Sequence, residues 1–217
     1  MDSNTAYKFV SEGNLMSGMR GAFTPDVALE TTATLMNAGI KVVELTMNSA
    51  QPIAAMQAVK KEYGDDACVG MGTVLDVETA KSVLDAGADF VVSPAFQPAV
   101  VEVVLAADVL MAPGVITPSE AVAAWSMGVK LLKLFPVGAL GIDYFNAIFG
   151  PLRHMNFMCN GAMTADNAPQ FIKAGAAACG MAGWLTGNGT MSQTTIQSRA
   201  RLLRESIRAT NDKTRLV

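Results

Sequence analysis

One stretch of the sequence, residues 109–136, decides the fold: it reads VLMAPGVITPSEAVAAWSMGVKLLKLFP. Two short apolar runs, 109–112 and 129–135, flank a segment, 118–127, whose apolar residues recur with the period of a helix. Thr117 precedes this segment and is a residue type that caps the first turn of a helix. The stretch therefore predicts a strand, a helix and a second strand parallel to the first.

The same unit recurs along the chain, with an apolar run about every 20 to 25 residues. Eight runs are expected to form strands: 15–19, 41–47, 68–73, 90–93, 109–112, 129–135, 157–159 and 177–181. Eight segments of helical period lie between and after them: 25–38, 51–63, 77–86, 97–106, 118–127, 140–149, 165–174 and 191–209. A further helix, over residues 4–12, is expected before the first strand.

Strands that alternate with helices predict right-handed units and a parallel sheet, and eight of them predict a closed barrel. The alternative is a doubly wound open sheet, but the segment 70–72 (GMG) lacks the third glycine of a dinucleotide-binding loop. No linker or charge block indicates a second domain. The sequence therefore predicts one α/β domain over residues 1–217, a (β/α)8 TIM barrel with a short extra N-terminal helix.

The composition argues against several classes of function. The chain is 51% hydrophobic and 16% charged with a net charge of −3, so we expect neither nucleic acid nor a membrane as partner. Its three cysteines lie in apolar runs without a CxxC spacing, which is typical of reduced thiols in a cytoplasmic protein. With a single histidine, no metal site is expected. The N-terminus shows no secretion signal, and no apolar run is long enough to cross a bilayer.

Two predicted strands carry a charged residue, which is costly to bury. Lys133 shares a strand face with Leu131, and Glu44 shares one with Val42 and Thr46. The two strands are four apart in a ring of eight, so Lys133 and Glu44 meet across the barrel centre if both point inward. Two structural interpretations stay open: a buried ion pair, or a Lys133 that points outward between helices.

The functional interpretation of this pair is covalent catalysis. Burial of Lys133 in an apolar strand lowers its pKa, and the neutral amine can attack a ketone. Glu44 would then carry protons, either directly or through a water molecule.

Five motifs follow one another in an order that resembles a known family. They are 39–46 (GIKVVELT), 72–74 (GTV), 92–94 (VSP), 113–120 (PGVITPSE) and 132–136 (LKLFP). They resemble the 2-keto-3-deoxy-6-phosphogluconate (KDPG) and 4-hydroxy-2-oxoglutarate (KHG) aldolases, from about residue 15 to residue 185. The resemblance implies a class I aldolase on a (β/α)8 barrel, usually a homotrimer, that acts on a small-molecule keto acid without a metal or cofactor.

The resemblance also implies roles for individual residues. Lys133 matches the lysine that forms the Schiff base, and Glu44 matches the general acid and base. Thr73 matches a threonine that holds the pyruvate carboxylate, and Arg20 matches an arginine near the distal phosphate of the substrate. Three further residues match positions that line the pocket: Pro94, Pro113 and Phe135.

The chain departs from the family pattern at three positions. Asn48 stands where many members carry an arginine, and residues 48–52 (NSAQP) resemble the related 2-keto-3-deoxy-6-phosphogalactonate aldolases, whereas Thr46 keeps the pattern of the gluconate enzymes. The phosphate is expected at backbone N–H groups after the seventh and eighth strands, at Gly161, Ala162, Ala182 and Gly183. Ala162 replaces a family glycine and Gly183 replaces a family serine, so this site is expected to be weaker.

The sequence therefore predicts a lyase that cleaves 2-keto-3-deoxy-6-phosphogluconate to pyruvate and glyceraldehyde 3-phosphate. One alternative is an aldolase for the galactonate epimer or for 4-hydroxy-2-oxoglutarate. The others are a sugar-phosphate epimerase or isomerase, and an idle barrel that binds a keto acid or phosphate. Trp184, after the eighth strand, is expected to pack rather than to line the pocket.

Overall fold

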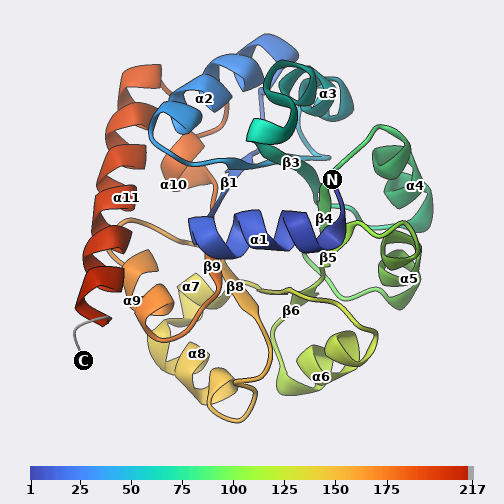
Figure 1. Cartoon of the computed structure of the whole chain (residues 1–217), viewed down its shortest axis with the longest axis vertical. Coiled ribbons are helices and arrows are strands. Elements are labelled where there is room, and N and C mark those ends of the chain that lie inside the picture. The colour runs from blue at the N-terminus through green and yellow to red at the C-terminus, as the bar shows by residue number, and fades with distance from the viewer. Residues whose placement is uncertain (215–217) are drawn as a thin grey trace.

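Parallel strands curl into a barrel in the computed structural model, which describes residues 1–214 and the side chains of residues 1–210. Their pairing order within the described chain is β5-β4-β3-β2-β1-β9-β8-β7-β6 (Figure 1). The strands are β1 (Leu15–Met19), β2 (Val42–Thr46), β3 (Cys68–Gly72), β4 (Phe90–Val92), β5 (Leu110–Ala112), β6 (Gly114–Val115), β7 (Leu132–Leu134), β8 (Phe157–Asn160) and β9 (Ala178–Met181). The predicted domain, 1–217, ends among residues 215–217, which lie outside the described residues.

The two end strands of this order, β5 and β6, close the ring because only Pro113 separates them in the sequence. Proline has no N–H group for the ladder, so the strand is interrupted there. β5 pairs with β4 and β6 pairs with β7. The predicted eight-strand barrel is therefore confirmed, with a fifth strand that is split at Pro113 and extends beyond the predicted run 109–112.

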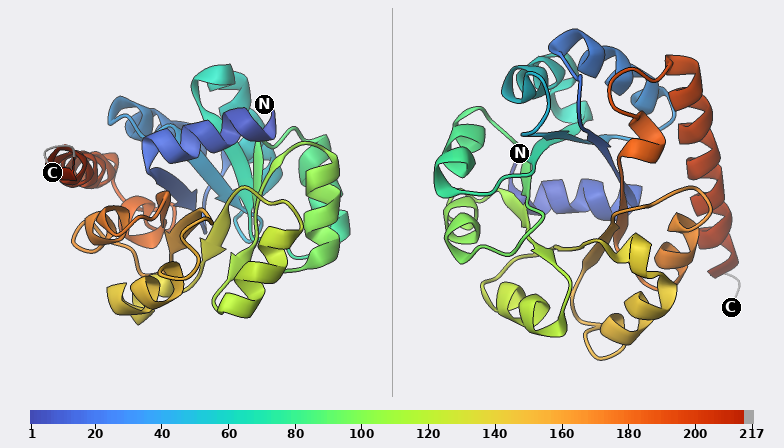
Figure 2. Two further views of the ribbon diagram at one scale, coloured as in Figure 1. Left: turned by 60° about the horizontal axis from the view of Figure 1, so that its bottom comes forward. Right: turned by 180° about the vertical axis from the view of Figure 1, so that it is seen from behind.

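Helices form a ring around the barrel (Figure 2). They are α1 (Ser3–Gly13), α2 (Pro25–Asn37), α3 (Pro52–Tyr63), the 3-10 turn η1 (Gly64–Asp66), α4 (Val77–Asp85), α5 (Pro98–Ala106), α6 (Pro118–Ser126), α7 (Val137–Leu140), α8 (Ile142–Phe149), α9 (Ala168–Lys173), α10 (Gly183–Thr186) and α11 (Gln193–Thr214). The predicted helix 140–149 is confirmed as α8, and the short helix α7, which was not predicted, precedes it, with Gly141 at a φ of +86° between the two. The short helix α10 was not predicted.

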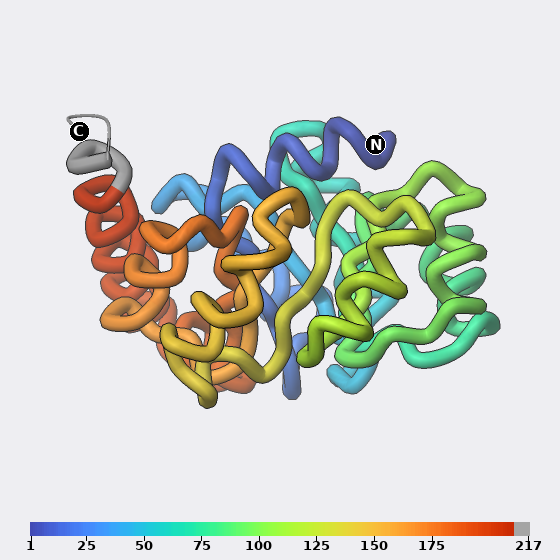
Figure 3. The backbone as a smooth tube through the Cα atoms, turned by 90° about the horizontal axis from the view of Figure 1, so that it is seen from below, coloured from blue at the N-terminus to red at the C-terminus, as the bar shows by residue number. Residues whose placement is uncertain are grey.

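The extra N-terminal helix lies across the end of the barrel where the strands begin (Figure 3). Its residues Ala6 and Val10 are fully buried. They belong to one apolar cluster with the first inward side chains of the strands, among them Met16, Val42, Cys68, Phe90, Leu131 and Met158. The helix therefore closes the N-terminal end of the barrel and leaves the opposite end for a binding site.

Side chains along β7 alternate between the barrel interior and the surrounding helices, as the period of a strand requires. Leu132 and Leu134 belong to the apolar cluster between strands and helices, whereas Leu131 belongs to the interior cluster. In the register of the sheet, Lys133 lies opposite Gly114 on β6 and Met158 on β8. Lys133 consequently faces the barrel interior.

Among the described residues, no helix has the length and hydropathy needed to cross a lipid bilayer.

Candidate active site

A cavity of about 420 Å³ opens at the C-terminal ends of the strands. It is lined from β1, β2, β7, β8 and β9 and the loops that follow them. Eight residues predicted from the sequence line it together: Arg20, Glu44, Lys133, Phe135, Gly161, Ala162, Ala182 and Gly183. In a barrel of this kind, ligands bind at this face, because the loops that follow the strands converge there.

Lys133 lies on β7 and is only 4% exposed. Its backbone N–H donates to the carbonyl of Pro113 at 2.9 Å, and its Nζ lies 5.1 Å from the centre of the Phe135 ring. Burial lowers the pKa of the Lys133 amine, the nearby charge of Glu44 opposes this shift, and the charge of Arg20 adds to it. Burial thus raises the share of the neutral amine, which is the nucleophilic form.

Glu44 lies on β2, 5% exposed, and borders the same cavity. A side chain on Gly72 would collide with the Glu44 carboxylate, and a Cβ on Gly18 would lie 3.6 Å from its Oε2. Gly72 therefore makes room for the carboxylate inside the barrel, whereas the distance from Gly18 is an ordinary contact. Among the described side chains, Lys133 and Glu44 are not joined as an ion pair within 4.0 Å. The open interpretations of an outward lysine and of a structural ion pair are both contradicted.

Three polar residues that the sequence analysis did not select as site residues also border the cavity: Thr46, Asn160 and Thr164. Asn160, at the end of β8, is 7% exposed, and its Oδ1 is buried without a hydrogen-bond partner among the described residues. Gly180 leaves space for its amide, because a Cβ there would collide with it. Thr46 donates its hydroxyl to the carbonyl of Met19 at 3.1 Å. Asn160 directly follows the predicted run 157–159, so a search for polar residues inside the predicted strands did not reach it.

Trp184 lines the cavity as well, so the expectation that it only packs was wrong. The guanidinium carbon of Arg199, on α11, lies 5.3 Å from the centre of the Trp184 ring. The same guanidinium donates to the backbone carbonyl of Trp184. Arg199 therefore holds the short helix α10 and its tryptophan at the cavity wall.

Four predicted residues lie outside the cavity lining: Asn48, Thr73, Pro94 and Pro113. Asn48 is exposed in the turn after β2, and Thr73 is half-buried after β3 with a φ of +60°, which is uncommon for a β-branched residue. Pro113 is buried in the break between β5 and β6, where its carbonyl accepts from Lys133. A Cβ on Gly114 would collide with the backbone of Pro94. As substrate-binding residues, the four stay predictions.

The loops expected to bind phosphate lie at the rim of the cavity. Gly161 and Ala162 both adopt a left-handed φ, +89° and +53°. Gly183 begins α10, and a Cβ built on it would meet no atom within 4 Å. Arg20, exposed just after β1, adds a positive charge to this rim. Backbone donors and one cation thus border the same opening, which suits an anionic ligand.

Groups of three or more side chains that are able to hold a metal ion are absent from the described part of the chain.

A barrel of this topology, with a buried lysine and carboxylate in a cavity at the ends of the strands, belongs to the TIM-barrel enzymes. Comparison with known proteins narrows this class. The sequence model of the family "Aldolase: KDPG and KHG aldolase" matches residues 11–202. The 2-dehydro-3-deoxy-6-phosphogalactonate aldolase of Escherichia coli K12 is 32% identical over 187 residues, which cover 86% of this chain and 91% of that protein.

Two other comparisons point to the same family. The 2-dehydro-3-deoxy-phosphogluconate aldolase of Treponema pallidum (strain Nichols) is 32% identical over 146 residues, 67% of this chain and 69% of that protein. A solved structure described as native KDPGal superimposes with a TM-score of 0.87 at 30% identity, over 91% of this chain and 96% of that one. The chain belongs to the KDPG and KHG aldolase family, and it is an aldolase, a carbon–carbon lyase.

Proposed function

We propose that this aldolase is of class I and cleaves 2-keto-3-deoxy-6-phosphogluconate to pyruvate and glyceraldehyde 3-phosphate. The observation that carries the proposal is the buried Lys133, whose pKa is lowered and which faces a cavity that it shares with Glu44. A lysine amine in this setting is suited to form an imine with a keto acid.

In the proposed reaction, the neutral Nζ of Lys133 attacks the C2 ketone and forms a carbinolamine. Glu44 donates a proton to the departing hydroxyl, and water leaves as the protonated imine forms. Glu44 then takes the proton of the C4 hydroxyl while the C3–C4 bond breaks. The electron pair of that bond moves toward the imine and forms an enamine. Protonation at C3 and hydrolysis of the imine release pyruvate and restore the lysine.

The remaining polar groups of the cavity are proposed to hold the substrate. Arg20 and the backbone N–H groups of the loops at residues 161–162 and 182–183 border the cavity and are proposed to bind the distal phosphate. The unpartnered Oδ1 of Asn160 offers a buried acceptor to a substrate hydroxyl. Thr73 and Asn48 are proposed for the carboxylate end of the substrate on the family resemblance, with Pro94, Pro113 and Phe135 as apolar walls.

The galactonate epimer is the second candidate substrate. The Escherichia coli relative is named for that epimer, and it is matched over 91% of its length. Residues 48–52 of this chain also resemble that branch. The two epimers give the same products and differ only at C4, so direct comparison of the two substrates decides between them.

We also propose that residues 1–217 form one domain and assemble as a cytoplasmic homotrimer, as the family resemblance implies. Light scattering of the purified protein tests the assembly, since a trimer has three times the mass of the chain. A monomer that is fully active would refute it.

The proposal is tested by incubation with pyruvate, reduction with borohydride and mass spectrometry of the protein. We expect a pyruvate adduct on Lys133 in the wild type and none in Lys133→Ala or Lys133→Arg, because guanidinium stays protonated. Cleavage of the gluconate and galactonate substrates is then followed by release of pyruvate, and we expect it to persist in EDTA. Absence of the adduct would exclude the class I mechanism for this aldolase, whereas an adduct without cleavage of either sugar acid would exclude both of them as substrates.

A further inference from the structure

A second hollow, of about 550 Å³, lies at the opposite end of the barrel from the active site. It is bordered by α1, by the segment that leads into β2, and by α11. Phe9 and Ile40 provide apolar surface, and Ile40 is 1% exposed. The volume falls in the range of small-molecule sites, roughly 300 to 1,000 Å³. We call it the N-terminal hollow.

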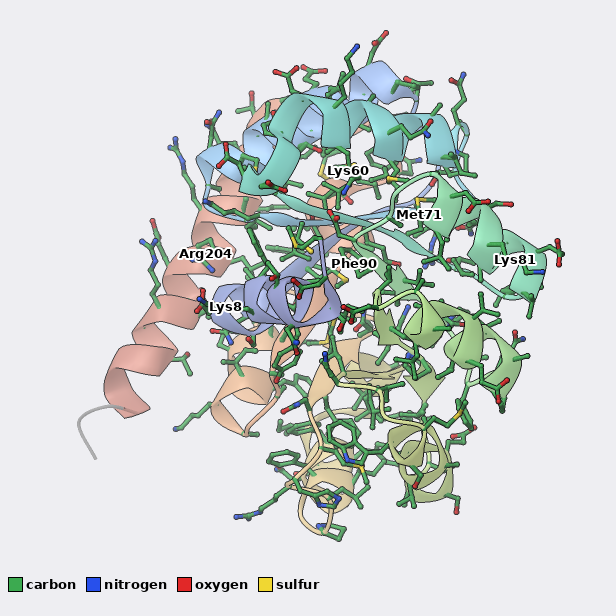
Figure 4. All side chains as sticks on the ribbon, turned by 45° about the vertical axis from the view of Figure 1, so that its right-hand side comes forward. Lys8, Lys60, Met71, Lys81, Phe90 and Arg204 are labelled. Atoms are coloured by element: carbon green, nitrogen blue, oxygen red, sulfur yellow. The ribbon has the colours of Figure 1, made fainter. Side chains whose placement is uncertain are left out.

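Three cations border the N-terminal hollow: Lys8, Lys41 and Arg204. Figure 4 shows Lys8 on α1 beside Arg204 on α11. Lys8 pairs with Glu12 at 3.8 Å, but among the described side chains no carboxylate pairs with Lys41 or Arg204. Glu12 also borders the hollow, so its charged residues sum to +2, although the chain as a whole carries a net charge of −3.

Of the three cations, Arg204 gives the most evidence for a bound ligand, because one of its donors has no partner. Its Nη1 donates to the carbonyl of Gly13 at 2.7 Å and so caps the C-terminal end of α1. Its Nε is buried and has no acceptor among the described residues. Burial and then the charge of Arg208 lower the pKa of Arg204, although a guanidinium stays charged in proteins. Capping of α1 uses one N–H group and leaves the buried Nε and the missing counter-charge unexplained.

We propose that the N-terminal hollow binds a small organic anion, with one acidic group on Arg204 and Lys41 and an apolar body against Phe9 and Ile40. The acidic group, a carboxylate, phosphate or sulfonate, would supply the charge that the hollow lacks, and a planar guanidinium binds such groups with two parallel hydrogen bonds. This site is separate from the active site, because Leu15 at the start of β1 borders the hollow, whereas Arg20, just after the end of β1, lies at the rim of the other cavity.

The test uses 8-anilinonaphthalene-1-sulfonate, a fluorescent sulfonate with an apolar body, titrated into the full-length protein. We expect saturable binding of one dye per chain, weakened at least tenfold by Arg204→Met and by Lys41→Met. Arg201→Met is the matched control, because it removes the same charge from an exposed residue of α11 that does not border the N-terminal hollow. We expect this control, and Arg20→Met at the active site, to leave dye binding unchanged.

A neutral analogue, N-phenyl-1-naphthylamine, separates charge from apolar contact, and we expect it to bind at least tenfold more weakly than the sulfonate. Equal binding of the two dyes, or equal binding to wild type and to Lys41→Met, would overturn the proposal. Loss of binding in Arg20→Met would place the dye in the active site and would also overturn it. Because Arg204 caps α1, its variant can fail to fold; the exposed Lys41 then decides the result.

Discussion

The interior of the barrel consists of two layers that contrast in chemistry although the same strands build both. In the layer near α1, β2 contributes Val42 and β8 contributes Met158, and both side chains are buried in an apolar cluster. Two residues further along each strand, the layer at the open end holds Glu44 and Asn160. The pair Leu131 and Lys133 repeats the contrast on the segment that ends in β7. A step of two residues therefore separates the part of the interior that packs against α1 from the part that borders the cavity.

In the layer at the open end, which we call the upper layer, glycine is as important as the polar side chains; the layer near α1 is the lower layer. Gly72 makes room for the Glu44 carboxylate, and Gly180 makes room for the Asn160 amide. In the lower layer, Gly70 gives space to the ring of Phe90, which fills the barrel instead of leaving a cavity. The comparison teaches that the site depends on which side chain faces each glycine: a polar group at the open end, an aromatic ring at the closed end.

The largest effect is expected from Glu44→Gln, which keeps the shape of the side chain but removes its ability to accept a proton. We expect cleavage to slow by about 100-fold to 10,000-fold, the usual contribution of a general acid or base. The melting temperature should stay close to that of the wild type, because the volume is unchanged. Steady-state kinetics and calorimetry check both points, and a loss of less than tenfold would exclude Glu44 as the proton carrier.

The opposite result is expected in the lower layer. Leu131→Ala removes a fully buried side chain from the interior cluster, two residues before Lys133. We expect the free energy of unfolding to fall by about 2 to 5 kcal/mol, as for other large-to-small core substitutions. Denaturant unfolding measures the loss, and kcat per folded molecule should change little. If kcat fell as far as in Glu44→Gln, the two layers would not be separable in function.

The sequence predicts the strands better than it predicts the loops. Strand period grouped Lys133 with Leu131 and Glu44 with Val42, because alternation is a property of the backbone, but it did not decide which face points inward. The break of the fifth strand at Pro113 depends on how β5 and β6 pair with different neighbours, which no local pattern contains. Likewise, Trp184 lines the cavity because Arg199, fifteen residues away, holds its backbone carbonyl. Such long-range contacts decide loop conformation, and they are invisible to periodicity.

The charge of Lys133 gives a third test, through the pH dependence of stability. Burial lowers its pKa in the folded protein from the ordinary value of 10.5, so between the two values the unfolded chain binds more protons. The free energy of unfolding therefore rises with pH in that window, by at most about 1.4 kcal/mol per pH unit. Below the pKa of the folded protein, the cost of burying the charged amine is present in full. We expect Lys133→Met to be more stable than wild type at neutral pH, with a difference that shrinks as the pH approaches 10.5. Denaturant unfolding across this range measures it, and a difference that grows with pH would contradict the assignment.

The smallest effect is expected at the rim, from Ala162→Gly. Ala162 adopts a φ of +53°, where a Cβ is crowded by the backbone at a cost of about 1 to 2 kcal/mol. Glycine removes this strain but adds freedom to the unfolded chain, so we expect a net gain in stability of about 0.5 to 1 kcal/mol. Ala123→Gly, at an exposed position inside α6, is the matched control and should instead lose about 1 kcal/mol.

If the loop contacts the phosphate, the same Ala162→Gly change should lower KM for the phosphorylated sugar acid, because bare backbone then faces the ligand. Formation of the pyruvate imine should be unaltered. A variant that gains stability without a change in KM would keep the strain argument and remove Ala162 from the phosphate site.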